Sequence, residues 1–221
     1  MTPKDLLKFA DHTLLNVTAT TPDYIRLCDE GLTYGVASVC VPPSRVQLCS
    51  QHLAGMLAVC TVVGFPNGYT TSLAKANEAE LSIKNGAAEI DMVIDIGKAK
   101  DHDYSAVLAD IKTVRAATAG YILKVIIETA LLTDEEKIAL CHVVNESGAN
   151  FIKTSTGFAG GGATFADVAL LKANVAANIG VKAAGGITSL EDAYHFISLG
   201  ASRLGTSRIV KLVQGMAGEG Y

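Results

Sequence analysis

Three lysines interrupt short apolar stretches of the sequence, a pattern that points to chemistry at a carbonyl group. Lys124 lies in "ILKVIIE", Lys153 in "FIKTS" and Lys182 in "VKAAGG". A lysine attacks a carbonyl carbon only as the free amine, and with a reference pKa near 10.4 only about one in a few thousand is neutral at pH 7. A nucleophilic lysine therefore needs surroundings that favour its neutral form.

The order of the segments makes Lys182 the candidate for that role beside Lys153. If both point inward from neighbouring strands, a second ammonium about 5 Å away disfavours the charged form by roughly 3 kcal/mol at an effective dielectric of about 20. That is on the order of two pKa units, and partial desolvation acts in the same direction. With Asp91 moving protons through a water, the pattern predicts an imine-forming lyase that needs no metal and no cofactor.

The charges in these stretches also have plainer interpretations. A single lysine in an apolar strand more often lies at the rim, with its ammonium in water. Glu89 begins a strand and is expected to be solvated, Asp95 is explained equally well as a helix cap, and Asp11 as a brace for the first loop. Because burying charge is costly, a structural ion-pair network is the main alternative to catalysis. The charges in question are Asp11, Asp91, Asp95, Lys124, Glu128, Lys153 and Lys182.

Glycine-rich turns give a second chemical signal. "AAGGITS" places Gly185 and Gly186 before a helix start, and "SRLGTSRIV" places Gly205 and Ser207 before another. Backbone N–H groups at such turns bind anions, phosphate in particular. Any one glycine turn is more often simple turn chemistry, but two on consecutive strands favour a phosphate site, to which Gly157 of "STGF" adds a third.

The segments that carry these residues alternate between short β-branched stretches and longer stretches of helical period. Helix signals include Thr21 as the expected N-cap of "TPDYIRLCDEGLTYG" and a capping box of Thr133 with Glu136. The alternation, repeated about eight times, predicts a (β/α)8 TIM barrel, a single domain over residues 1–221 with a short N-terminal helical segment. The expected strands are "KFADHTLL", "VASVCVPP", "LAVCTVVGFP", "EIDMVIDI", "YILKVIIET", "FIKTSTG", "VKAAGG" and "SRLGTS".

A doubly wound open sheet is the rival fold. It usually carries its glycine loop after the first strand, whereas the glycines of this chain cluster late in the sequence. We therefore favour the barrel.

The composition limits the kinds of partner that this protein is expected to bind. A formal net charge of -4 and a pI near 5.7 argue against nucleic-acid binding, which needs a basic patch. The apolar stretches are too short to cross a bilayer, so no membrane partner is expected. The five cysteines are odd in number and form no C-x-x-C pair, which favours a reducing, cytoplasmic location. The scattered histidines predict no metal site.

The sequence also resembles the deoxyribose-phosphate aldolase family of class I aldolases, collinearly from about Asp11 to Ser207. The resemblance implies a TIM barrel that reversibly cleaves 2-deoxy-D-ribose 5-phosphate to D-glyceraldehyde 3-phosphate and acetaldehyde, in deoxyribonucleotide catabolism. A homodimer is the expected assembly. The resemblance rests on "DHTLL", "SVCVPP", "VVGFPNG", "EIDMVI", "KVIIETALLTDEE", "FIKTSTGF", "VKAAGGI" and "RLGTS".

The resemblance also assigns roles to individual residues. It implies that Lys153 is the Schiff-base lysine and that Asp91 and Lys182 donate and accept protons. Asp11 and Lys124 match polar positions that support the site or contact substrate. The phosphate-binding positions are matched by Gly157, Gly185, Gly186, Gly205 and Ser207.

At one position this chain departs from the family pattern, and at a second position the pattern allows two outcomes. Longer members carry a lysine after "STG", where this chain has Phe158, so phosphate binding would depend more on backbone N–H groups. Tyr221 ends the chain, and in some members a terminal tyrosine folds over the site; a frayed tail is the alternative. Other functions left open are a pyridoxal-phosphate barrel, a non-catalytic sugar-phosphate-binding barrel and a metal-dependent class II aldolase.

Overall fold

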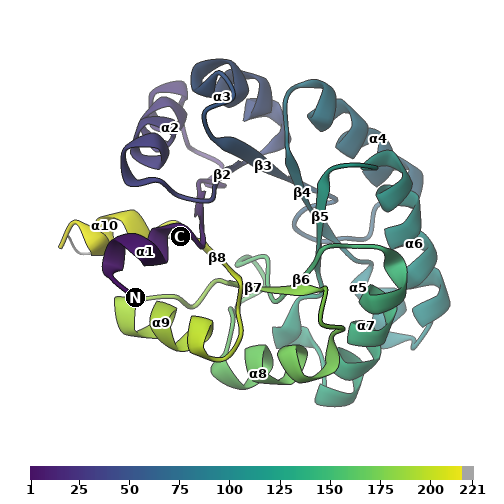
Figure 1. Ribbon diagram of the computed structural model, residues 1–221. Coiled ribbons are helices and arrows are strands. Elements are labelled where there is room, and N and C mark those ends of the chain that lie inside the picture. Colours follow the sequence, from purple (N-terminus) through teal and green to yellow (C-terminus); the bar gives the residue numbers. More distant parts are fainter. Residues whose placement is uncertain (216–221) are drawn as a thin grey trace.

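Eight parallel strands close into a barrel in the computed structural model, which describes residues 1–215 (Figure 1). The strands follow one another around the barrel in chain order, and β1 closes it by pairing with β8. The predicted TIM barrel is confirmed. The strands are β1 (Ala10–Thr13), β2 (Ser38–Val41), β3 (Ala58–Val63), β4 (Glu89–Val93), β5 (Ile122–Ile126), β6 (Phe151–Lys153), β7 (Gly180–Ala184) and β8 (Arg203–Thr206).

Helices form an outer layer around the strands (Figure 1), and the first of them is the predicted N-terminal helical segment. Within residues 1–215, no helix is both long and apolar enough to cross a membrane. Tyr221, a candidate cover for the site, lies outside the described residues. The helices are α1 (Pro3–Leu7), α2 (Thr21–Tyr34), η1 (Pro43–Arg45), α3 (Val46–Leu53), α4 (Ser72–Lys84), α5 (Ile96–Lys100), α6 (Tyr104–Ala117), η2 (Thr129–Leu131), α7 (Asp134–Ser147), α8 (Phe165–Asn174), α9 (Leu190–Ser198) and α10 (Ile209–Val213).

Side-chain caps fix where the helices begin. In α7 the Thr133 hydroxyl accepts from the Glu136 N–H and the Glu136 carboxylate accepts from the Thr133 N–H, which confirms the capping box. In α2 the prediction was wrong by one residue, because Thr20 is the cap and its N–H and hydroxyl both donate to the Asp23 carboxylate (2.8 and 2.6 Å). Asp95 caps α5, which is one of the two roles expected for it from the sequence.

The register of the barrel explains why charges from distant segments meet. Asp91 lies beside Lys124, Lys153 beside Lys182, and Lys182 beside Arg203. Because side chains alternate between the barrel interior and the helix layer, residues two apart in a strand share the interior. The residues between them face the helices and form a fully buried apolar core that includes Ile90, Leu123, Ile152, Val181 and Leu204.

A buried ion pair outside the barrel interior anchors the end of β4. Lys75, on α4, is fully buried and donates to the Val93 carbonyl (2.8 Å) and to the Asp110 carboxylate on α6 (2.7 Å). Loss of one partner would leave an uncompensated buried charge, which costs about 3–5 kcal/mol. Two helices are thereby tied to the strand that carries Asp91.

Candidate active site

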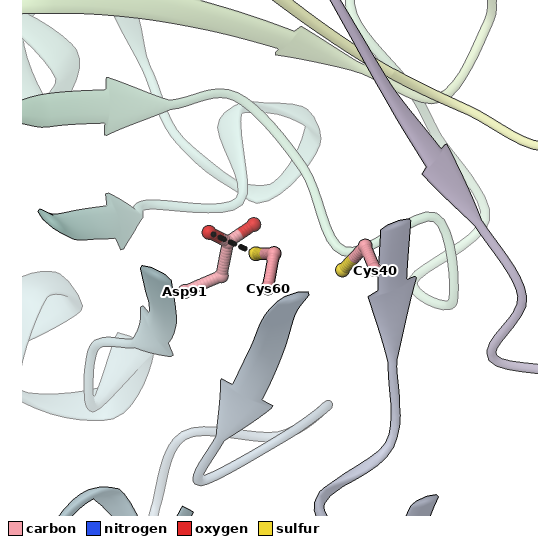
Figure 2. A group of neighbouring side chains, drawn as sticks. All are labelled: Cys40, Cys60 and Asp91. Atoms are coloured by element: carbon pink, nitrogen blue, oxygen red, sulfur yellow. Dashed lines mark hydrogen bonds between the residues drawn. The ribbon is translucent and has the colours of Figure 1, made fainter. Parts of the chain in front are cut away.

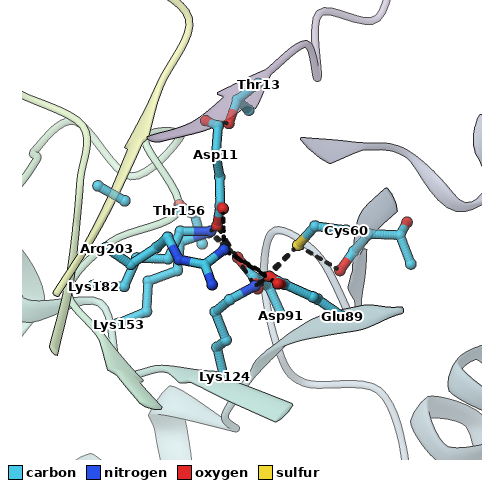
Figure 3. Close-up of polar contacts among 12 residues, drawn as sticks. Asp11, Thr13, Cys60, Glu89, Asp91, Lys124, Lys153, Thr156, Lys182 and Arg203 are labelled. Carbon is cyan, nitrogen blue, oxygen red and sulfur yellow. Dashed lines mark hydrogen bonds and ion pairs between the residues drawn. The ribbon is translucent and has the colours of Figure 1, made fainter. Parts of the chain in front are cut away.

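The carboxylate of Asp91 lies at the centre of the charged barrel interior (Figure 3). Its Oδ2 accepts from Nζ of Lys153 at 2.8 Å and from Nζ of Lys182 at 2.6 Å. Its Oδ1 accepts from Nζ of Lys124 at 2.8 Å. The side chains in this group are at most 5% exposed. The three lysines that the strand pattern singled out therefore converge on one acid.

Asp11, Glu89 and Arg203 complete the cluster. Nη1 of Arg203 lies 2.5 Å from Oδ1 of Asp11 and 2.9 Å from Oε2 of Glu89. Lys124 binds the same Glu89 oxygen at 2.6 Å. Lys182 pairs with Oδ2 of Asp11. Asp11 thus joins the ion-pair cluster instead of bracing only the first loop.

The expectation that Glu89 is solvated was wrong. Glu89 is only 4% exposed, although it begins its strand after a turn. The physical reason is that Arg203 and Lys124 reach its carboxylate inside the closed barrel and compensate its charge. An open strand end would have left this carboxylate in water.

The cluster carries one more positive charge than negative charge. Every charge has an opposite partner within hydrogen-bonding distance, which makes burial tolerable. Loss of one proton would leave equal numbers of cations and anions. Among residues 1–215 the cations are Lys124, Lys153, Lys182 and Arg203, and the carboxylates are Asp11, Glu89 and Asp91.

Pairing overrides burial in setting the protonation of this cluster. Burial raises the pKa of the Asp91 carboxyl, but three ammonium groups outweigh burial and hold that pKa well below its usual range. Burial lowers the pKa of Lys182, yet the carboxylates of Asp11 and Asp91 raise it above the ordinary lysine value. The pKa of Arg203 is raised in the same way, against burial, by Asp11 and Glu89. Lys182 and Arg203 are therefore fixed cations at neutral pH.

Two thiols border the Asp91 side of the cluster (Figure 2). Sγ of Cys60 donates to Oδ1 of Asp91 at 3.2 Å, and Cys40 lies beside Cys60 in register on β2. These three side chains are close enough together to hold a metal ion. However, Nζ of Lys124 lies 3.2 Å from Sγ of Cys60, and burial raises the pKa of that thiol well above its usual value. A protonated thiol beside surplus positive charge is a poor cation ligand, so we assign no metal to this group.

A cavity of about 380 Å³ opens beside this cluster, and Lys153 reaches its wall with 4% of its surface exposed. The lining comes largely from the turns after β6, β7 and β8, the face on which TIM barrels carry their binding sites. All of the predicted phosphate-binding residues lie in the lining, namely Gly157, Gly185, Gly186, Gly205 and Ser207.

The turn after β7 requires glycine for conformational and for steric reasons. Gly185 and Gly186 both have φ of +72°, a region that costs most other residues about 1–2 kcal/mol. A Cβ on Gly185 would lie 3.0 Å from Cα of Gly162. A Cβ on Gly205 would lie 3.0 Å from Cε of Lys182 and would press on that catalytic candidate.

The turn after β6 is held by a buried acid, Glu128, which lies two residues beyond the end of β5. The Thr156 N–H donates to Oε2 of Glu128 at 3.1 Å, and the Thr156 hydroxyl makes a short hydrogen bond to the same oxygen. Phe158 follows, and its ring packs edge-on against Phe65 with the centroids 5.3 Å apart. The position after "STG" therefore contributes an aromatic contact to the β3 turn.

Sequence reasoning missed Glu89 and Arg203 as members of the cluster and Arg208 as a residue of the cavity lining. Signals existed for two of them, since Glu89 shares a strand face with Asp91, and Arg203 shares one with Gly205. Arg208 directly follows Ser207, and one sequence contains no pattern that distinguishes it from a surface arginine.

The comparisons with known protein sequences all lead to aldolases. The model of the DeoC/LacD aldolase family matches residues 6–217. A deoxyribose-phosphate aldolase from Streptococcus pyogenes serotype M4 is 54% identical over 217 residues, which are 98% of this chain and 97% of the relative. One from Streptococcus agalactiae serotype Ia is 54% identical over 214 residues, 97% of this chain and 96% of the relative.

Solved structures agree in fold over nearly the whole chain. A putative deoxyribose-phosphate aldolase from Coccidioides immitis superposes with a TM-score of 0.94 at 39% identity, covering 97% of this chain and 87% of the other. The deoxyribose phosphate aldolase from Aeropyrum pernix, described as a unique tetrameric structure, gives a TM-score of 0.90 at 32% identity and covers 97% and 92%.

Proposed function

This chain belongs to the DeoC/LacD aldolase family, and on that premise we propose that it is a class I deoxyribose-phosphate aldolase. It reversibly cleaves 2-deoxy-D-ribose 5-phosphate to D-glyceraldehyde 3-phosphate and acetaldehyde, in the catabolism of deoxyribonucleotides. The observation that carries the proposal is a cavity-lining lysine, Lys153, bound to Asp91 and adjacent to Lys182.

The charge balance supports Lys153 as the nucleophile. The pKa values of Lys124, Lys182 and Arg203 are raised because nearby carboxylates outweigh burial, so these three stay charged. Lys153 has a single carboxylate partner among residues 1–215, and it shares that partner with two other lysines. Deprotonation of Lys153 leaves three cations facing three carboxylates. The cluster then carries no net charge.

The reaction begins when neutral Lys153 attacks the C1 aldehyde of the open-chain sugar phosphate and loses water to form an iminium. Asp91, through a water and together with Lys182, takes the proton of the C3 hydroxyl. The C2–C3 bond breaks because the iminium accepts its electron pair as an enamine. Glyceraldehyde 3-phosphate leaves, the enamine is protonated at C2, and hydrolysis releases acetaldehyde and free Lys153.

Supporting roles follow from position. Lys124 and Asp11 hold Asp91 and Lys182 in place, and neither of the two supporting residues is part of the cavity lining. The phosphate is held by the turns carrying Gly157, Gly185, Gly186, Gly205 and Ser207, and this grip orients C3 toward the acid.

Three broader features belong to the same proposal. Residues 1–221 act as one aldolase domain.

The five buried, free thiols support a reducing, cytoplasmic setting. Two chains assemble as a homodimer, supported by the exposed Leu73 and Leu81 on α4, and light scattering on the purified protein measures this directly.

The decisive experiment is borohydride reduction in the presence of acetaldehyde, followed by peptide mass spectrometry. We expect a single two-carbon adduct on Lys153 and cleavage of 2-deoxy-D-ribose 5-phosphate that a chelator does not reduce. An adduct on another lysine would refute the assignment of the nucleophile. Activity that depends on a metal, or visible absorbance of a pyridoxal cofactor, would replace the mechanism with one of its alternatives.

A further inference from the structure

One cationic side chain in the cavity lining has no part in the mechanism above. Arg208 directly follows Ser207 after β8 and lines the same cavity as Lys153, Gly157 and Gly185. It is half-buried, and none of the ion pairs within residues 1–215 involves its guanidinium group. Since Arg208 lines the cavity and its guanidinium has no carboxylate partner among residues 1–215, that group is available to an anionic ligand.

The other groups at this end of the cavity are mainly backbone N–H dipoles, which carry no net charge. Within residues 1–215, no hydrogen bond occupies the backbone N–H groups of Gly157, Gly186 and Ser207. Such free donors in the cavity lining suit phosphate oxygens, because unpaired N–H groups in glycine-rich turns bind anions. A phosphate monoester, however, carries about 1.5 to 2 negative charges at pH 7, and backbone N–H groups bring no net charge against it.

The other cations of the site are committed elsewhere. Lys153 forms the bond to C1, at the opposite end of the substrate from the phosphate. Lys182 and Lys124 are fully buried and bound to carboxylates. In the turn after β6, Phe158 packs on Phe65 and offers a ring instead of an ammonium group. Among residues 1–215, two cationic side chains line the cavity, Lys153 and Arg208.

We propose that Arg208 is the specificity-determining residue for the phosphate group, and that its guanidinium makes this chain prefer phosphorylated over unphosphorylated 2-deoxyribose. This inference rests on the proposed aldolase function and deepens it. The charge comes from the turn after β8, next to Ser207, so the planar guanidinium donates two parallel hydrogen bonds to phosphate oxygens while the backbone N–H groups hold the rest.

The test compares kcat/KM for 2-deoxy-D-ribose 5-phosphate and for 2-deoxy-D-ribose in the full-length protein and in Arg208→Gln and Arg208→Lys. We expect Arg208→Gln to lower kcat/KM for the phosphorylated sugar about 10- to 100-fold, mostly through KM, and to leave the unphosphorylated sugar within about twofold. Inhibition by inorganic phosphate should weaken by a similar factor. Arg208→Lys should lie between, because an ammonium keeps the charge but loses the two-pronged geometry.

Arg26→Gln is the matched control. Arg26 lies on α2, is 65% exposed and pairs with Asp23 at 2.6 Å, so its loss removes the same charge without touching the lining of this cavity. We expect both sugars to react as in the wild type. Trapping of acetaldehyde on Lys153, which needs no phosphate, checks that Arg208→Gln is folded and competent.

The outcomes separate the two claims. If the wild type cleaves neither sugar, the proposed function fails. If the wild type cleaves the phosphorylated sugar but Arg208→Gln keeps the same ratio of kcat/KM for the two sugars, only the role of Arg208 is refuted. A loss of the same size in Arg26→Gln would also refute it, since a general charge effect would then explain the result.

Discussion

The ammonium groups of Lys153 and Lys182 bind the same oxygen atom, Oδ2 of Asp91, at 2.8 and 2.6 Å. From the sequence, Lys182 was expected to act on Lys153 as a bare charge. The structure adds a carboxylate between them, so the effect of Lys182 alone is partly cancelled. The surplus positive charge near Lys153 therefore belongs to the whole cluster, to which Arg203 also contributes.

Lys182→Met should lose most of its turnover. The substitution removes the cation that is fixed on the same oxygen of Asp91 and that takes part in proton transfer. We expect kcat to fall at least about 100-fold, measured by release of glyceraldehyde 3-phosphate. Near-native rates would show that neither the charge nor the proton of Lys182 matters, provided that circular dichroism confirms the fold.

Arg203→Gln should shift the pH dependence of catalysis. Removing this fixed cation takes away the surplus positive charge, so protonated Lys153 becomes better compensated and its free amine less accessible. The acid limb of the kcat/KM profile should move to higher pH by about one unit, an estimate for one unit charge across several ångströms at an effective dielectric of about 20. Arg203→Lys should return the acid limb to its wild-type pH. A lower rate of Arg203→Gln with an unchanged pH profile would mean that the substitution only disturbs packing.

Acid should destabilise the fold through the buried carboxylates. Burial raises the pKa of Asp11, but Lys182, Lys124 and Arg203 outweigh burial and lower it below the usual value. Because the folded-state pKa is depressed, this stabilisation is fully present above the unfolded value of about 3.9 and is lost as pH falls toward the folded value. Urea unfolding between pH 6 and 2 measures this loss.

Asp11→Asn gives the comparison for that experiment. Its free energy of unfolding should decline less steeply below about pH 4, by up to about 1.4 kcal/mol per pH unit. The variant should also be less stable at pH 7, since Arg203 and Lys182 each lose a charged partner. Parallel slopes for the wild type and the variant would mean that Asp11 does not carry the acid sensitivity.

Gly185→Ala should weaken substrate binding, and Gly120→Ala should not. Both positions have positive φ, +72° and +86°, so both variants should lose about 1–2 kcal/mol of stability. Only Gly185 lines the cavity, and only there would a Cβ approach another turn, at 3.0 Å from Cα of Gly162. We expect KM for the phosphorylated sugar to rise severalfold in Gly185→Ala alone. Equal KM values in the two variants would remove this turn from the phosphate site.

Local patterns in the sequence are enough to predict the barrel. The alternation of strand and helix signals is local, and so are the caps, because Thr133 and Glu136 contact each other within one turn. The pairing of Lys153 with Lys182 was also accessible, since consecutive strands in a barrel are neighbours and strand side chains alternate with period two.

The balance of the buried charges depends on contacts that form when the barrel closes. Closure of β1 onto β8 brings Arg203 to Asp11, which is 192 residues away, and lets it reach Glu89 across the interior. Whether a charge at a strand end is solvated or buried depends on partners that arrive from elsewhere in the chain. No local pattern carries that information, which is why Glu89 was misjudged and why Arg208 emerged only from the lining of the cavity.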